Sequence, residues 1–210
     1  MLAKRDGYFV AMAPAESYLD PSTSAFDRSL LHTYPEWKEL QPDFAYRGHN
    51  TYAYLVSKYG TTKLSDASVI NTFDLVTVQL YEGYSHAFYH IEVLKESPAA
   101  YLAGLIERLT TGWMVDFGAD LALKWPSQRV KVPLDQLVIG LGNGWAGDGK
   151  FLLIRPEEIA AAYTHMKDLG IAPRGFAFWN ILDEGVVPLN SLEKNPVWMA
   201  RGLNQFLNIR

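Results

Sequence analysis

Apolar residues gather in four short, nearly continuous runs instead of alternating with polar ones. Such runs are typical of parallel strands covered on both faces, and they predict strands at residues 8–14, 73–81, 134–142 and 175–181. The first run begins almost at Met1. Because Asp6 follows the basic pair directly and the apolar run is short, we expect a buried strand there and no signal peptide.

Three segments combine helical spacing with start and stop signals, namely residues 97–112, 155–170 and 195–208. Pro98 and Pro156 stand in first turns, and Gly112 follows the last apolar position of its segment. The alternation of strands and helices predicts an α/β fold in one domain over residues 1–210. Residues 15–65 are interpreted as loop-rich, and residues 113–133 as either a helix continuation or a hairpin.

The composition narrows the class of partner. The net charge is −4 and the basic residues are scattered, so no nucleic-acid partner is expected. The absence of cysteine excludes disulfides and thiolate metal sites. No apolar run approaches the ~18 residues of a membrane span, so no membrane partner is expected. Aromatic residues make up 13% of the chain, which suits stacking on flat apolar faces such as sugar rings.

The glycine-rich stretch "GNGWAGDGKF" (142–151) matches two phosphate-binding patterns, and each fails where its chemistry lies. A P-loop needs Ser or Thr after Lys150, where Phe151 stands, and a dinucleotide fingerprint needs a helix that starts at the glycines. Here the predicted helix begins only at Pro156. We therefore expect no nucleotide and no cofactor, and a ligand-facing loop with Trp145 at its tip.

Two strand ends carry polar and aromatic groups suited to an amido sugar. Gln79 and Tyr81 flank Leu80 on one strand, so both point to the same face. Their carboxamide and phenol can bond an acetamido group, or each other as a core pair. Trp179 ends another strand and offers a flat floor for a pyranose ring, or simple packing. We expect the three side chains to converge on one hollow.

Other candidate groups lack a supporting pattern. The carboxylates near strand ends are expected to be hydrogen-bonded or solvated, without a catalytic pKa; they are Glu16, Glu82, Asp183 and Glu184. His86 and His90 have a spacing that suits a metal, but no third ligand is evident, so packing or surface placement and no metal site are expected. No serine lies in a G-x-S-x-G elbow, so no catalytic triad is predicted.

Taken together, four regions resemble the family-18 glycoside hydrolases, the chitinase family. "FVAMAPAESY" is similar to the end of the family's fifth strand, and "DLVTVQLYE" to its sixth-strand pattern D-x-V-x-V-Q-x-Y-N. "LVIGLGNGWAGDGKFLLIRPEEI" resembles the seventh-strand loop, and "GFAFWNILDE" the eighth-strand G-x-M-x-W followed by an acidic residue. The resemblance runs in order through the chain. It implies a partial (β/α)8 TIM barrel comprising approximately strands five to eight with covering helices.

The family resemblance also implies a mechanism and a substrate. A glutamic acid protonates the glycosidic oxygen of a β-1,4-linked N-acetylglucosamine polymer such as chitin, while the acetamido group of the sugar attacks. Tyr81 would orient that acetamide. The implied substrate contacts are Gln79, Glu82, Trp179, Met12, Ala13 and Trp145, with Glu82 standing where members usually have Asn or Asp. The family is usually secreted, which implies an extracellular location.

The family's acid motif, D-x-x-D-x-D-x-E, is absent from the 210 residues. Because the chain starts at the fifth-strand pattern, we expect the front half of the barrel to be missing and the chain to be inactive alone. The unpaired edges of a half-barrel predict self-association. The alternatives are a non-catalytic, lectin-like carbohydrate-binding protein and an unrelated parallel α/β domain.

Overall fold

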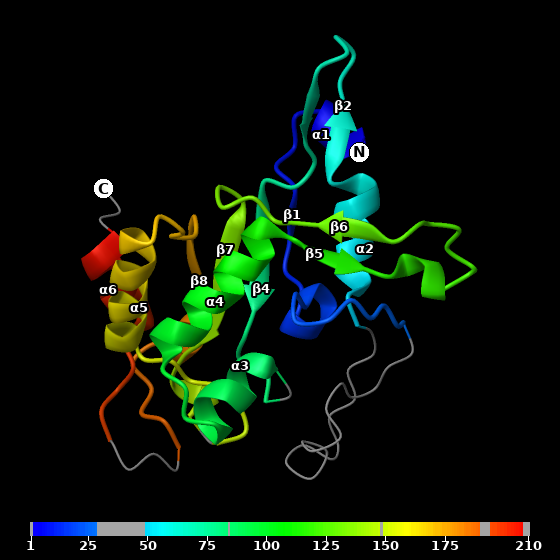
Figure 1. Ribbon diagram of the computed structural model, residues 1–210. Coiled ribbons are helices and arrows are strands. Elements are labelled where there is room, and N and C mark those ends of the chain that lie inside the picture. Colours follow the sequence, from blue (N-terminus) through cyan, green and yellow to red (C-terminus); the bar gives the residue numbers. More distant parts are fainter. Residues whose placement is uncertain (1, 29–48, 84, 148, 190–193, 208–210) are drawn as a thin grey trace.

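Four parallel strands form the central sheet of the computed structural model, which describes residues 2–28, 49–83, 85–147, 149–189 and 194–207. Their order is β1 (Ala11–Met12), β4 (Leu75–Gln79), β7 (Leu137–Gly142) and β8 (Gly175–Trp179), as Figure 1 shows. Each neighbouring pair is parallel, and the spatial order follows the chain order. The protein therefore has the predicted α/β class, with a parallel sheet consistent with part of a TIM-barrel-like fold.

Three helices follow the strands close to where the sequence predicts them: α4 (Pro98–Thr111), α5 (Pro156–Asp168) and α6 (Met199–Leu207). The Ser97 side chain caps α4 by accepting from the Ala100 amide at 3.2 Å. Gly112 ends that helix with a φ of 90°, which a side chain disfavours. At α5 the Glu158 carboxylate accepts from the Arg155 amide at 2.8 Å.

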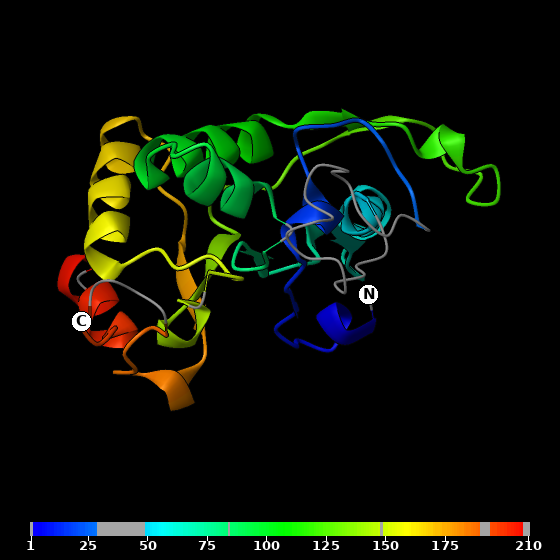
Figure 2. The same cartoon turned by 90° about the horizontal axis from the view of Figure 1, so that it is seen from below.

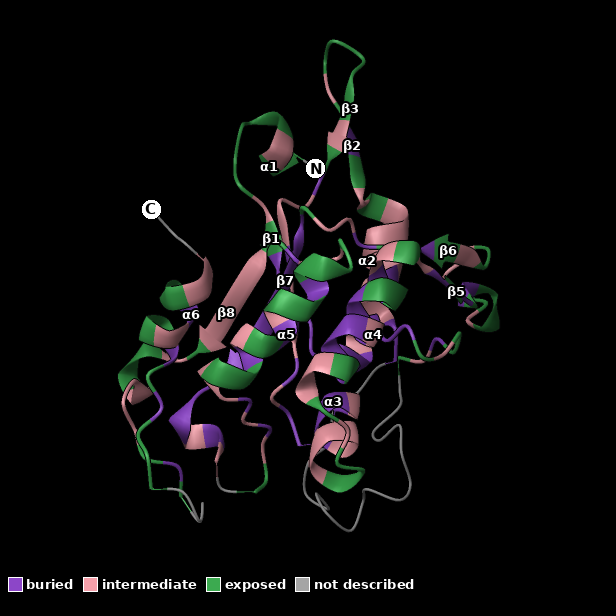
Figure 3. Cartoon of the chain, turned by 60° about the vertical axis from the view of Figure 1, so that its left-hand side comes forward, coloured by how far each residue is buried: buried purple, intermediate pink, exposed green. Residues whose placement is uncertain are grey.

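The hydrophobic core lies between one face of the sheet and helices α4 and α5 (Figure 2). Alternate residues of β4 and β7 enter it together with one stripe of each helix: Val76, Val78, Leu137, Ile139, Leu141, Leu102, Leu105, Ile106, Leu109, Ile159, Ala162 and Met166. In Figure 3 the buried residues of α4 and α5 occupy only part of each helix surface, as expected for amphipathic covering helices.

The opposite face of the sheet, which carries Gln79, Gly140 and Ala177, is called the open face below. Burial alternates along β4, and β8 is partly exposed along its length (Figure 3). Only β7 is buried throughout. The prediction of strands covered on both faces is therefore wrong for β4 and β8, because the helices pack on one side only.

The first predicted strand is shorter than its apolar run. Strand β1 has two residues, the short helix α1 (Leu2–Arg5) precedes it, and Tyr8 and Phe9 are exposed. A buried strand at the very beginning of the chain is thus a wrong prediction. Apolar character alone did not reveal that this stretch lies at an edge of the sheet, where one neighbouring strand is absent among the described residues.

Residues 15–65 are less loop-rich than the sequence predicts, although 29–48 lie outside the described residues. Helix α2 (Thr51–Tyr59) is held by aromatic contacts, including Tyr18 stacked on Tyr52 with ring centroids 5.5 Å apart. Strands β2 (Thr61–Lys63) and β3 (Val69–Asn71) form a hairpin.

The undecided segment 113–133 is a hairpin of β5 (Trp113–Val115) and β6 (Gln128–Val130). Helix α3 (His86–Phe88) continues into one π-helical turn, and the 3-10 turns are Glu16–Leu19, Phe117–Ala119, Gly144–Ala146 and Ile181–Asp183. Within the described ranges, no helix has the length and apolar character needed to cross a membrane.

Candidate functional site

Gln79, Tyr81 and Trp179 share the open face near the carboxyl ends of β4 and β8. In the strand register Gln79 lies beside Gly140, and Trp179 beside Gly142. Residues two apart on a strand point to the same side, so Tyr81 follows Gln79 onto this face. The three residues therefore lie on one face, and their convergence on a single hollow stays a prediction. The carboxyl ends of parallel barrel strands are also where active sites of such folds lie.

Two glycines of β7, Gly140 and Gly142, lie in the middle of this face, where neighbouring residues approach the backbone closely. A methyl group at Gly142 would come 2.7 Å from the Ala146 Cβ atom and 3.3 Å from the Tyr81 Cβ atom. A methyl group at Gly140 would come 3.2 Å from the Gln79 Cα atom. Both glycines are buried, so their missing side chains allow β4 and the turn after β7 to pack closely against this strand.

The polar groups of the open face are linked to one another. The Tyr81 hydroxyl donates to Gln79 Oε1 at 2.9 Å, and Gln79 Nε2 donates to the Ala13 carbonyl at 3.0 Å. The Trp145 ring packs edge-on against Tyr81 with centroids 5.7 Å apart, and its Nε1 donates to the Trp179 carbonyl. The hydrogen bond between Tyr81 and Gln79, which the sequence offered as an alternative to ligand binding, is thus present, but it lies near the surface and not in the core.

The Trp179 side chain is 62% exposed, so it offers a free aromatic surface at the end of β8. The peptide bond that follows it, to Asn180, is cis. Fully buried Asn143 donates from Nδ2 to the Asn180 carbonyl at 2.7 Å, which fixes the chain just after Trp179. The sequence signal for Asn143 is a polar residue directly after the carboxyl end of a buried strand.

Two of the implied substrate contacts are buried. Met12 pairs with Val76 in the register and belongs to the hydrophobic core. Glu82 is 3% exposed, so its carboxylate is buried and is not presented at the surface of the open face. The implied ligand contact of Met12 is wrong, because the strand register turns its side chain toward the core, and a role for Glu82 stays a prediction. Ala13 is exposed, and its carbonyl holds Gln79.

Asp183 and Glu184 follow Trp179 and have structural partners, as expected. Asp183 accepts from Asn180 Nδ2 at 2.7 Å, and Glu184 accepts from the Ala200 amide at 2.8 Å. These contacts tie the loop after β8 to itself and to the start of α6.

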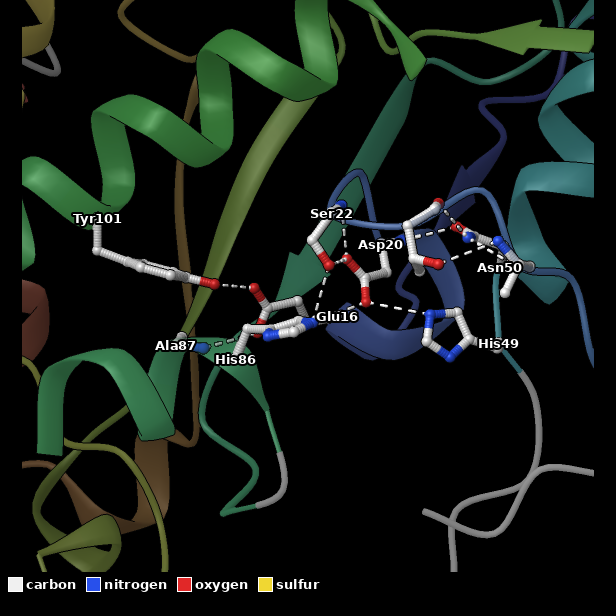
Figure 4. A network of polar contacts seen from close by, with 10 residues as sticks. Glu16, Asp20, Ser22, His49, Asn50, His86, Ala87 and Tyr101 are labelled. Carbon is white, nitrogen blue, oxygen red and sulfur yellow. Dashed lines mark hydrogen bonds and ion pairs between the residues drawn. The ribbon is translucent and has the colours of Figure 1, made fainter. Parts of the chain in front are cut away.

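Glu16 is a buried carboxylate that sequence reasoning did not distinguish from the others. Its Oε1 accepts from the Tyr101 hydroxyl of α4, and its Oε2 accepts from the Ala87 amide of α3 at 3.0 Å (Figure 4). Burial raises the pKa of Glu16, against the opposing effects of the His86 charge and these two hydrogen bonds. Because its partners belong to the helix layer, Glu16 does not supply an acid to the open face.

Asp20 forms the second half of the same network. Its Oδ2 lies 2.9 Å from His86 Nε2 and 3.2 Å from His49 Nε2, and its Oδ1 accepts from Ser22 (Figure 4). Burial alone would raise the pKa of Asp20, but the bonds from His49, His86 and Ser22 together hold it well below its usual range. Burial lowers the pKa of His86, and Asp20 more than offsets this, so that pKa is raised.

The Glu16–Asp20 network surrounds a cavity of about 70 Å³, room for about two water molecules. Ser22 Oγ and Asp20 both approach the same nitrogen of His86, whereas a catalytic triad uses the two opposite ring nitrogens. Among the residues with described positions, no cluster of three or more His, Asp or Glu side chains can hold a metal ion. His90 instead bonds Glu96 at 2.8 Å and packs against Tyr101.

Comparison with known proteins supports the fold alone. The chain is similar to the crystal structure of a family GH18 chitinase from Chromobacterium violaceum, with a TM-score of 0.55 and 18% identity. The match covers 99% of this chain and 47% of the chitinase, so the chain spans about half the length of that protein. No family model and no curated protein sequence matches the chain. The chain therefore has a chitinase-like fold.

Proposed function

We propose that residues 1–210 are one incomplete chitinase-like glycoside hydrolase domain that acts on β-1,4-linked N-acetylglucosamine polymers, chitin or chitooligosaccharides, outside the cell. What supports this most is the joint position of Gln79, Tyr81 and Trp179 on the open face, on either side of two glycines. The half-length fold similarity to a chitinase adds to it.

In this proposal one sugar ring lies on the exposed indole of Trp179. The carbonyl of its acetamido group accepts the hydrogen bond that the Tyr81 hydroxyl donates to Gln79 Oε1 in the unliganded protein. Gln79 stays anchored by the Ala13 carbonyl and keeps its place beside the ring. The Trp145 ring, packed against Tyr81, limits rotation of the phenol.

Hydrolysis by substrate-assisted retention needs a carboxylic acid that protonates the leaving oxygen. The motif that carries this acid in the family is absent from the chain, and Glu16, a buried carboxylate with a raised pKa, faces the helix layer. We therefore expect the 210-residue chain to bind chitooligosaccharides without turning them over.

Calorimetric titration with chitotetraose tests the proposed site. Trp179→Ala should weaken binding about tenfold, which corresponds to about 1.4 kcal/mol and the loss of one aromatic contact. Tyr81→Phe removes one hydrogen bond and should weaken binding by up to tenfold. Trp125→Phe, in the hairpin region, is the matched control. Equal affinity for all four proteins would contradict the assignment, and turnover of a fluorogenic chitotriose substrate would contradict the missing acid.

The second candidate is a non-catalytic, lectin-like carbohydrate-binding protein. The exposed Trp179 beside a site without an acid favours it, because such a face binds sugars without further chemistry. The DNA upstream of Met1 separates the two candidates. An in-frame D-x-x-D-x-D-x-E segment there supports the hydrolase, and its absence supports the lectin-like protein.

A further inference from the structure

A second hollow lies on the helix layer, away from the open face. Its volume is about 510 Å³, within the range of roughly 300–1,000 Å³ of small-molecule sites. It opens between the first turn of α5 and the start of α6, whose positions Figure 1 shows side by side. The helices meet closely there, since a methyl group at Gly202 would come 2.2 Å from the Pro156 Cβ atom.

Trp198 lines this hollow with its indole ring, and the backbone at Gly185 packs against that ring. Two backbone bonds fix its neighbours: Gly185 N donates to the Val197 carbonyl at 2.8 Å, and Val197 N to the Val186 carbonyl at 3.0 Å. The Trp198 ring lies against Gly185, where a methyl group would come 2.6 Å from the ring. The side chain is nevertheless 49% exposed. A rigid indole surface is therefore presented to the hollow.

The polar wall combines donors and acceptors. Arg201 donates only and the Glu157 carboxylate accepts only, while the amides of Asn195 and Gln205 do both. Arg155 also lines the hollow, so a phosphate group would be attracted by two arginines, but because it only accepts it could not donate to the Glu157 carboxylate. Sugar hydroxyls donate and accept, so adjacent hydroxyls of one ring satisfy such a wall. A guanidinium and planar amides are also suited to bonding two neighbouring oxygens at once.

We propose that this hollow is a second carbohydrate site, in which a pyranose ring of a chitooligosaccharide stacks on Trp198 and its hydroxyls bond Arg201, Gln205 and Glu157. Its chemistry is independent of the open face, although the choice of chitooligosaccharide rests on the proposed function. The site would hold a polymer strand on the outer layer while the open face holds another.

Calorimetry with chitotetraose on four full-length chains tests the second site: wild type, Trp179→Ala, Trp198→Ala and the double variant. We expect Trp179→Ala to weaken the open-face event about tenfold and to leave the second event unchanged, and Trp198→Ala in that background to weaken the second event about tenfold. Unchanged residual binding in the double variant overturns the second site. If Trp198→Ala alone abolishes chitotetraose binding while Trp179→Ala binds like the wild type, the second site is supported and the proposed function is contradicted.

A second comparison does not depend on Trp198. Gln205→Ala and Asn204→Ala replace neighbouring exposed amides of α6, of which only Gln205 lines the hollow. In the Trp179→Ala background, Gln205→Ala should weaken chitotetraose binding several-fold and Asn204→Ala should leave it unchanged. Equal effects of the two variants, or displacement of the sugar by inorganic phosphate, overturn the proposal.

Discussion

At the scale of single residues, the position of a carboxylate determines its chemistry. Glu16 and Asp20 are four residues apart and both are buried, yet their pKa values move in opposite directions. Asp20 has two histidines and a serine as partners, whereas Glu16 has one phenol and one amide. For Glu16 the cost of burial prevails, and for Asp20 the hydrogen bonds prevail.

The raised pKa of Glu16 predicts how stability changes with pH. Between its ordinary value of 4.5 and the raised value, the folded state binds more protons than the unfolded one. The contribution of Glu16 to the free energy of unfolding is therefore present at low pH and is lost as the pH rises through its folded-state pKa. Relative to Glu16→Gln, the wild type should lose up to about 1.4 kcal/mol of unfolding free energy per pH unit above 4.5.

Urea denaturation of wild type and Glu16→Gln across pH 4–8 measures this difference. A difference that is constant with pH, or that rises with it, would show that Glu16 is not held protonated by burial. Histidines and carboxylates outside the Glu16–Asp20 network titrate alike in both proteins and largely cancel, whereas His86 is coupled to Glu16, so His86→Gln and the double variant complete the comparison.

At the scale of elements, β7 determines the shape of the open face. It is the one strand of the four-stranded sheet that is buried throughout, and Gly140 and its last residue, Gly142, lie against β4 and the following turn. Gly175 in β8 is a strand glycine of another kind, because a methyl group there would have no neighbour within 4 Å.

Gly142→Ala and Gly175→Ala should therefore differ sharply. The Gly142 substitution forces a shift of Ala146 or Tyr81 and should cost about 1–3 kcal/mol of unfolding free energy. Gly175→Ala should be neutral or stabilise by up to about 1 kcal/mol, through the lower entropy of the unfolded chain. Denaturant titration of both variants gives the comparison, and equal effects would show that the close approach at Gly142 is easily relieved.

At the scale of the whole molecule, the sheet is open at both ends. Strands β1 and β8 each have one neighbour in the described part of the chain, and apolar side chains cluster beside them: Tyr8, Phe9, Trp179, Ile181 and Leu182. Parallel sheets are normally covered and their edges protected. The two edge strands run in the same direction, so we expect β8 of one copy to pair in parallel with β1 of another.

We accordingly expect self-association, measurable by light scattering coupled to size exclusion as masses above 23.6 kDa. Leu182→Lys places a charge beside the β8 edge and should shift the mass toward the monomer. Leu121→Lys, equally exposed but on the β5–β6 hairpin, should not. A monomer at all concentrations would contradict edge pairing.

The chain positions of β4, β7 and β8, the starts of α4 and α5, and the shared direction of Gln79 and Tyr81 were determined by the sequence itself. They depend on local signals: apolar runs, Pro98 and Pro156 at helix starts, and a side-chain period of two. The sequence left the hairpin at 113–133 as one of two alternatives and did not predict helix α2, since contacts with distant segments decide both.

Only the tertiary structure decided which side each residue faces and what it meets there. The hydrogen-bond partners of Glu16 lie 71 and 85 residues away along the chain. Met12 faces the core because it pairs with Val76, whose side chain also points there. The hollow beside Trp198 likewise forms where α5 and α6 meet at Gly202. Local patterns carry no information about such long-range contacts, so burial, pKa and the shape of a site emerge only on folding.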